Sequence, residues 1–158
     1  EPVNIERLQR LEEIIATNNN SSHTLEKIIE AFVEPALRIS LKDEKRHQYI
    51  LKLMARVHSE SLEIREMILG QFQNVMQRFV AALKIALPHL SNQELIWRFV
   101  FMVGAMFMSM THKPEIEDML DSKNGSPGIE EILQKMIPFL AAGFRAPVVN
   151  STNNGDNK

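Results

Sequence analysis

The chain has 158 residues, the length of one ordinary domain, and it contains no cysteine. The lack of cysteine excludes disulfides, thiolate zinc sites, iron–sulfur clusters and cysteine nucleophiles. Lysine and arginine number 18 against 20 acidic residues, and this net charge of −2 argues against a free-standing nucleic-acid binder. With 6 glycines, 7 prolines and 44% hydrophobic residues, the composition favours long, uninterrupted helices.

The first part of the chain predicts two helices. It begins at Glu1-Pro2 rather than with methionine, which suggests a fragment or a processed product. Apolar residues then recur at helical spacing over residues 3–16. After a polar loop, residues 25–37 follow the i, i+3, i+4, i+7 pattern of an amphipathic helix, which Pro35 is expected to kink.

The middle of the chain predicts three more helices. Asp43 can cap a helix that carries Met54 on its apolar face, and a long helix over about 62–87 ends at Pro88. Ser91 and Glu94 form a capping box that opens an apolar helix over 91–112. This helix does not read as a membrane span, because it falls short of roughly 20 apolar residues and contains an arginine.

The last part predicts a polar loop and one final helix. The loop covers residues 111–126, with a short helical turn near 116–120. Ser126 and Pro127 should cap and start a helix over 127–145, which Pro138 is expected to kink. Residues 147–158 form a polar tail that should be disordered. Because no strand-like alternation occurs, we expect an all-α fold, an antiparallel bundle of about six helices.

Patterns that carry catalytic chemistry are scarce. There is no glycine-rich phosphate loop and no metalloprotease or hydrolase motif. The five histidines pair neither with one another nor with carboxylates at a metal-ligand spacing. We therefore expect no enzymatic activity, no metal and no cofactor.

Arg98 is the most informative single residue, because an unpaired charge is costly to bury in an apolar helix. One interpretation is structural: an ion pair with Glu34 or Glu94, or capping of a nearby helix end. The other is an anchor for a ligand carboxylate or phosphate, which the planar guanidinium suits.

Methionines and small residues mark two apolar helices. Four of the nine methionines lie in 91–112, where they either pack a core or line an adaptable ligand pocket. Small residues at 104–105 and 141–143 would allow close approach of two backbones. These helices are covered either by the first four helices or by a second copy in a two-fold dimer, which we favour.

Several short motifs carry a family resemblance: Leu-Pro-x-Leu at 87–90, Glu-Leu-x-Trp-Arg at 94–98 and Phe-Met-x-Gly-Ala at 101–105. Glu-Pro-Val-Asn at 1–4, Glu-Pro-Ala-Leu at 34–37 and the stretch 137–146 fit the same group. Together they resemble the C-terminal domain of TetR-family transcriptional regulators.

The resemblance implies a ligand-binding and dimerisation domain over residues 1–146, in a cytoplasmic homodimer without membrane association. Residues 3–16 would end the linker helix from an absent helix-turn-helix head, through which alone the protein would contact operator DNA. Helices 91–112 and 127–145 would pair with their copies in a four-helix interface. The implied interface residues are Gly104, Ala105, Met108, Ile132, Met136, Phe139, Leu140 and Gly143.

The motifs are similar to those of fatty-acid-responsive repressors of this family. This similarity implies a small, largely apolar ligand, such as a fatty acid or an acyl derivative, that shifts the spacing of the DNA-binding heads. The implied pocket lining is Phe32, Met54, Phe72, Met76, Phe79 and Met102, with Trp97 and Arg98 closing one end. The alternative is a structural helical dimer or adaptor that binds no ligand.

Overall fold

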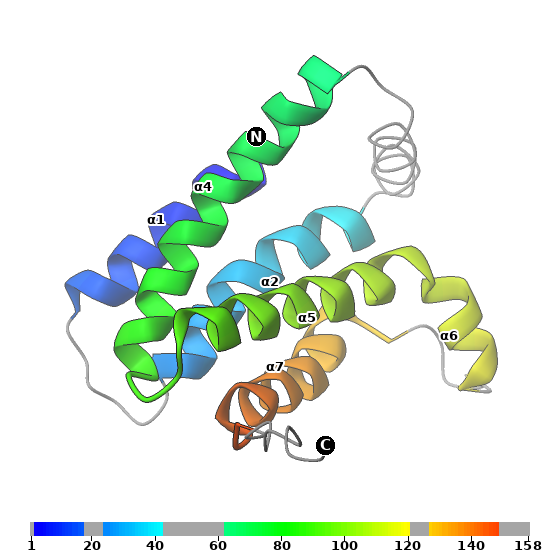
Figure 1. The fold of residues 1–158 in the computed structure, drawn as a ribbon. Coiled ribbons are helices and arrows are strands. Elements are labelled where there is room, and N and C mark those ends of the chain that lie inside the picture. The colour runs from blue at the N-terminus through cyan, green and yellow to red at the C-terminus, as the bar shows by residue number, and fades with distance from the viewer. Residues whose placement is uncertain (1, 18–23, 43–61, 121–126, 149–158) are drawn as a thin grey trace, which may run out of the picture.

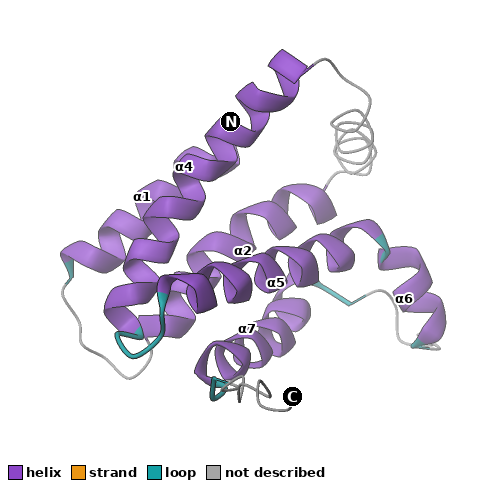
Figure 2. Ribbon diagram, in the orientation of Figure 1, coloured by secondary structure: helices purple, strands orange, loops and turns teal. Residues whose placement is uncertain are grey.

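The computed structural model describes residues 2–17, 24–42, 62–120 and 127–148, and every regular element among them is a helix (Figures 1 and 2). The predicted all-α fold is confirmed. The helices are α1 (Pro2–Ala16), α2 (Thr24–Lys42), α4 (Leu62–Ala86), α5 (Asn92–Thr111), α6 (Lys113–Met119) and α7 (Ile129–Arg145). The helix expected after Asp43, which would carry Met54, lies outside the described residues.

Helix α2 lies at the centre of the fold. It packs most extensively against α7 on one side and α1 on the other, and it also contacts α4 and α5. Figure 1 shows α1 running beside α4, while α5 crosses between α4 and α7. The central place of α2 follows from its sequence, because the apolar positions expected between residues 25 and 37 are all buried.

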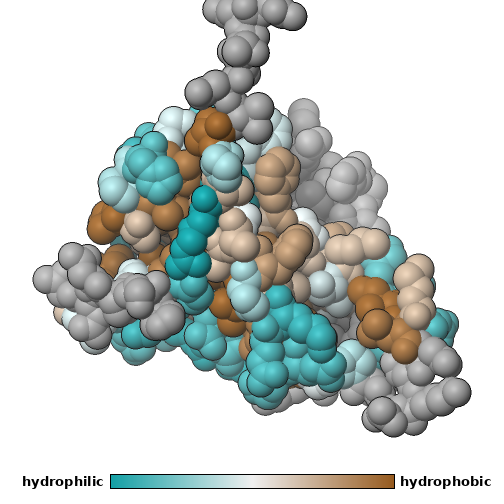
Figure 3. Space-filling view, turned by 90° about the horizontal axis from the view of Figure 1, so that it is seen from below, coloured by the Kyte–Doolittle hydropathy of each residue, from teal (hydrophilic) through white to brown (hydrophobic). Residues whose placement is uncertain are grey.

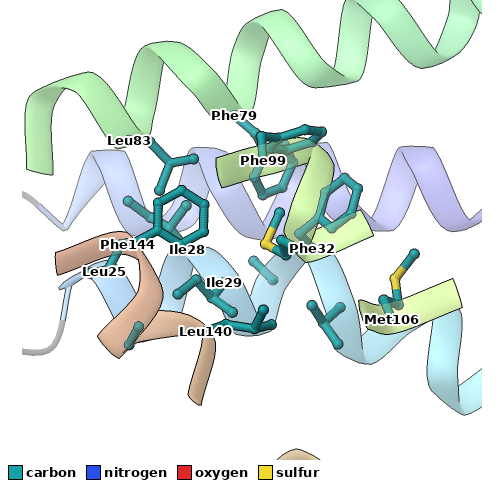
Figure 4. Close-up of a cluster of buried hydrophobic side chains, with 14 of the residues drawn as sticks. Leu25, Ile28, Ile29, Phe32, Phe79, Leu83, Phe99, Met106, Leu140 and Phe144 are labelled. Atoms are coloured by element: carbon teal, nitrogen blue, oxygen red, sulfur yellow. The ribbon is translucent and has the colours of Figure 1, made fainter. Parts of the chain in front are cut away.

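The core is built around three phenylalanine rings from three different helices. Phe32 of α2 meets Phe79 of α4 and Phe99 of α5 edge to face, with ring centroids 5.1 Å and 4.8 Å apart. Figure 4 shows these rings beside Leu83, while Leu140 and Phe144 approach from α7. Edge-to-face contacts add to the stabilisation that burial alone provides.

The helix ends agree with the sequence at α5 and differ at α7. The Ser91 hydroxyl accepts a hydrogen bond from the Glu94 amide at 3.2 Å, as the capping box predicts. The predicted start of the last helix at Ser126 and Pro127 was wrong. Gly128 occupies the N-cap position in an extended conformation, without a side-chain cap, and α7 begins at Ile129.

Helix α5 is long and apolar enough to cross a membrane by length and composition, with a mean hydropathy of 1.3. This is weak evidence for a span, because a core helix can pass the same test. In this fold one face of α5 packs into the core, through Leu95, Phe99, Met102, Met106 and Met110.

Candidate functional site

The residues predicted to line a pocket divide into two groups. Phe32, Phe79 and Met102 lie together in the core, each almost fully buried, and Phe99, which the sequence analysis missed, joins them. Phe72 is half-buried at the edge of this cluster, 6.3 Å from the ring of Phe99. These side chains therefore pack on one another.

Met76 is half-buried and packs against the outside of the core. It lines a hollow of about 400 Å³ on the outside of α4 and α5, together with Val80 and Ile96. Met54 falls outside the described residues. The structure thus brings together only part of the predicted lining.

Arg98 of α5 holds the end of α7. Its Nη1 lies 2.7 Å from the carbonyl oxygens of both Phe144 and Ala146, and its Nη2 lies 3.2 Å from the Glu94 carboxylate. The last carbonyls of a helix have no partner within the helix, and a cation there is favourable. Both structural alternatives raised for Arg98, pairing with Glu94 and capping of a helix end, are confirmed.

A stripe of apolar residues runs along the outer face of α5. We call it the α5 stripe: Trp97, Phe101, Gly104 and Met108, at the spacing i, i+4, i+7 and i+11. The three large side chains are 54%, 64% and 53% exposed, and the indole of Trp97 stacks on the ring of Phe101 at 5.9 Å. Trp97 therefore points away from the core, on the opposite face from Met102.

Helix α7 carries a second stripe with the same spacing. The α7 stripe consists of Ile132, Met136, Phe139 and Gly143. Phe139 is 71% exposed, whereas Met136 is buried. Leu140, also predicted for an interface, packs instead in the core of its own chain.

An apolar groove separates the two stripes. Its volume is about 540 Å³, and its walls are Ala105 and Ser109 of α5, Ile116 of α6, and Ile132 and Phe139 of α7. Figure 3 shows the molecule from below, where apolar side chains gather over the centre of the face and over α6. Charged side chains, Glu117, Glu131 and Lys135, also border the groove, and exposed apolar side chains with a polar rim are typical of interaction sites.

A buried arginine, Arg7 of α1, escaped the sequence analysis. Its residue surface is only 6% exposed, and its guanidinium carbon lies 3.9 Å from the centre of the Phe32 ring. Nε donates to the Phe32 carbonyl at 2.7 Å, Nη1 to Asn4 Oδ1 at 3.2 Å, and Nη2 to Met106 Sδ at 3.4 Å. Burial lowers the pKa of Arg7 to about 10, so the side chain remains cationic at neutral pH. The sequence does contain one signal for the burial of Arg7. In a helix with 3.6 residues per turn, Arg7 lies on the same face as Leu11 and Ile14.

Four alternating charges join α1 to α2. Arg10 pairs with Glu6 at 3.0 Å and with Glu34, and Arg38 pairs with Glu6 at 2.9 Å and with Glu34 at 2.5 Å. Burial raises the pKa of Glu34, but the hydrogen bonds from Arg10 and Arg38 together outweigh it, so the net pKa lies below its ordinary value. We call these residues the charge ring. Because Glu34 is paired with the two arginines of the charge ring, it is not the partner of Arg98.

Within the described parts of the chain, no three His, Asp or Glu side chains come together in a way that could hold a metal ion. The chemistry that the structure displays is apolar surface, with a few buried or paired arginines. Such an arrangement suits binding of molecules and of other chains.

Comparison with known families gives one match. Residues 30–143 match the family described as "Tetracyclin repressor-like, C-terminal domain". Because the match covers well over half of the sequence, the chain belongs to this family of TetR-type regulatory domains, and the resemblance seen in the sequence motifs is confirmed. No curated protein and no solved structure matches the chain.

Proposed function

We propose that this chain is the effector-sensing and dimerisation domain of a cytoplasmic TetR-type transcriptional repressor. Membership of the family supports a regulatory, non-enzymatic role in ligand binding and dimerisation. The single observation that carries the proposal is the exposed apolar α5 stripe, beside which Phe139 of the α7 stripe is also exposed.

The two stripes support a two-fold dimer. Their common spacing of i, i+4, i+7 and i+11 is that of the a and d positions of packed helices. Between them lies the groove of about 540 Å³, which a ridge of side chains from a second copy would fill. In a closed two-fold dimer the same patch serves both subunits, so α5 and α7 would form a four-helix interface with their copies.

Sedimentation equilibrium tests this dimer. We expect a dimer at micromolar concentration for the wild type and a monomer for Phe101→Glu, because the substitution would bury a charge in the interface. Ile85→Glu is the matched control: Ile85 is also an exposed apolar residue, but it lies on α4, away from both stripes. A monomeric wild type, or equal effects of the two substitutions, would contradict the proposed interface.

The proposed effector is a small, largely apolar molecule such as a fatty acid or an acyl derivative. The half-buried Phe72 at the edge of the aromatic cluster and the flexible methionines of the core, Met102 and Met106, would adapt to an apolar chain. The effector would change the spacing of two DNA-binding heads through α1. It can do so only by binding one arrangement more tightly than the other.

An operator-binding assay on a protein that includes the DNA-binding head tests the sensor role. Long-chain fatty acids and acyl thioesters are titrated against the operator complex, and at least one of these classes should release or strengthen DNA binding. If neither class has an effect, the proposed lipid effector is wrong.

A ligand-free structural dimer is the second candidate function. The tight packing of Phe32, Phe79 and Phe99 favours it, because these rings fill the space where the resemblance implies a pocket. Native mass spectrometry of the purified protein discriminates the two. A bound small molecule supports the sensor, and a bare dimer that gains no mass with added fatty acids supports the structural role.

A further inference from the structure

We propose that Arg7 is the anion-binding residue of the effector site and that the effector carries a carboxylate on an apolar chain. This inference rests on the proposed sensor function and goes further, because it assigns the charged end of the ligand and the residue that binds it.

Arg7 differs from the other arginines in its charge partners. The other arginines whose side chains the structure describes all pair with a carboxylate; these are Arg10, Arg38, Arg78, Arg98 and Arg145. Arg7 is the most buried of them, and no carboxylate among the described residues lies within ion-pair distance of it. A buried cation without an anion is costly, and an incoming carboxylate would remove that cost.

The guanidinium of Arg7 has more hydrogen-bond donors than described acceptors. A guanidinium carries five N–H groups, and the structure gives Arg7 three acceptors: the Phe32 carbonyl, the Asn4 amide oxygen and the Met106 sulfur. Among the described residues, no second acceptor is given for either terminal nitrogen, so one N–H on each would be available to a ligand. The two terminal nitrogens form the fork that binds a carboxylate through two parallel hydrogen bonds.

One terminal nitrogen of the Arg7 guanidinium has only a weak hydrogen-bond acceptor. The acceptor of Nη2 is the thioether of Met106, a weak acceptor on a flexible side chain, at 3.4 Å. A carboxylate oxygen would replace it with a stronger, charge-assisted bond. The surroundings are otherwise apolar, with the ring of Phe32 against the guanidinium and the buried Leu11 one turn further along α1. This combination fits an amphiphile better than a fully polar anion.

The position of Arg7 gives the ligand a direct hold on α1. Arg7 belongs to α1, yet its side chain contacts α2 at Phe32 and α5 at Met106. A head group that displaces Met106 would change how α1 sits against these two helices. In a full-length regulator this would act on the helix nearest the DNA-binding head.

Calorimetric titration with two matched probes tests the assignment: dodecanoate and 1-dodecanol, both below micelle-forming concentrations. We expect the wild type to bind dodecanoate about tenfold or more tightly than dodecanol. Arg7→Met should abolish this preference while leaving dodecanol binding within about twofold, since the apolar contacts remain. Arg78→Met is the control, because Arg78 is an exposed arginine paired with Glu12 of α1. The Arg78→Met variant should keep the preference for dodecanoate over dodecanol.

Each result is decisive. If Arg7→Met retains the preference for dodecanoate, the assignment of Arg7 is wrong while the sensor function stands. If Arg7→Met loses the same affinity for dodecanoate and for dodecanol, Arg7 has a structural role only, and this result also overturns the assignment. If the wild type binds neither probe, the lipid-sensor function and this inference fail together. If Arg7→Met does not fold, Arg7→Lys takes its place, because lysine keeps the positive charge without the planar fork. The preference of this variant for dodecanoate over dodecanol should fall several-fold. An unchanged preference overturns the proposal.

Discussion

Two arginines show how burial and hydrogen bonding decide what a residue does. Arg98 is surrounded by carbonyl oxygens at the end of α7 and by Glu94, so its donors are engaged within the chain. Arg7 is more deeply buried but has weaker partners and no carboxylate among the described residues. The arginine that stands out in the sequence therefore holds the end of α7, and the one that does not stand out is the one we propose as the ligand anchor.

Replacing Arg98 with alanine should destabilise the fold. The substitution leaves the carbonyls of Phe144 and Ala146 without their charged donor. We expect a loss of about 2 kcal/mol in the free energy of unfolding and a fall in Tm of roughly 4–8 °C, measured at fixed protein concentration. Arg78→Ala, which breaks an exposed ion pair with Glu12, should change stability by less than about 0.5 kcal/mol. Equal effects would contradict the capping role.

At the scale of elements, helices with a regular apolar pattern could be predicted well. The face of α2 and the serine cap of α5 follow from spacing and from one nearby residue, so local sequence is enough. The start of α7 was misplaced because Ser126-Pro127 and Gly128 are competing caps only two residues apart. The partners of Arg7 and Arg98 lie far away in sequence, on α5 and α7, and no local pattern encodes them.

The candidate site was harder to predict for a related reason. Periodicity identifies which side chains face inward, but it does not tell whether they surround a cavity or fill it. Phe32 and Phe79 do face inward, yet they pack against Phe99 at close range. The predicted interface stays a prediction, but three of its residues, Gly104, Met108 and Phe139, do lie on exposed faces that the core does not use.

The charge ring should make the contact between α1 and α2 sensitive to acid. Because the pKa of Glu34 is lowered in the folded state, its contribution is present above its ordinary pKa near 4.5 and is lost as the pH falls through the folded value. Glu34→Gln should therefore cost about 1 kcal/mol at pH 7. The difference from wild type should shrink as the pH falls below 4.5 and through the lowered pKa of the folded state, because wild-type Glu34 then becomes neutral itself.

Urea unfolding as a function of pH measures this difference. Glu131→Gln is the control, because Glu131 forms an exposed pair with Lys135 outside the ring. It should differ from wild type by less than about 0.5 kcal/mol at every pH. A Glu34→Gln variant that stays less stable than wild type at low pH would contradict the role of the ionised carboxylate.

At the scale of the whole molecule, the glycine of the α5 stripe separates folding from association. A methyl group added at Gly104 meets no atom within 4 Å in the single chain. Gly104→Ala should thus stabilise the isolated subunit by about 1 kcal/mol through helix propensity. In a closely packed dimer the same methyl group would overpack the interface and weaken association about tenfold.

Sedimentation over a range of concentrations, together with unfolding at low concentration, measures both effects. Gly70→Ala is the matched control, since Gly70 of α4 is also free of neighbours within 4 Å and lies off both stripes. It should raise subunit stability without changing the dimer. If Gly104→Ala and Gly70→Ala behave alike, helix α5 does not approach a second copy at this point.

The length and apolarity of α5 have a consequence for the life of the protein in the cell. A single subunit displays Trp97, Phe101 and Met108 to its surroundings on a helix apolar enough to cross a membrane. If the protein forms the proposed dimer, such a subunit would be a target for chaperones and proteases until it meets a second copy. Pairing is a second-order process, so halving the rate of synthesis would reduce the amount of dimer by more than half. Dimers of such a regulator would accumulate only above a certain concentration of subunits in the cell, because the outer face of α5 is exposed in the single subunit.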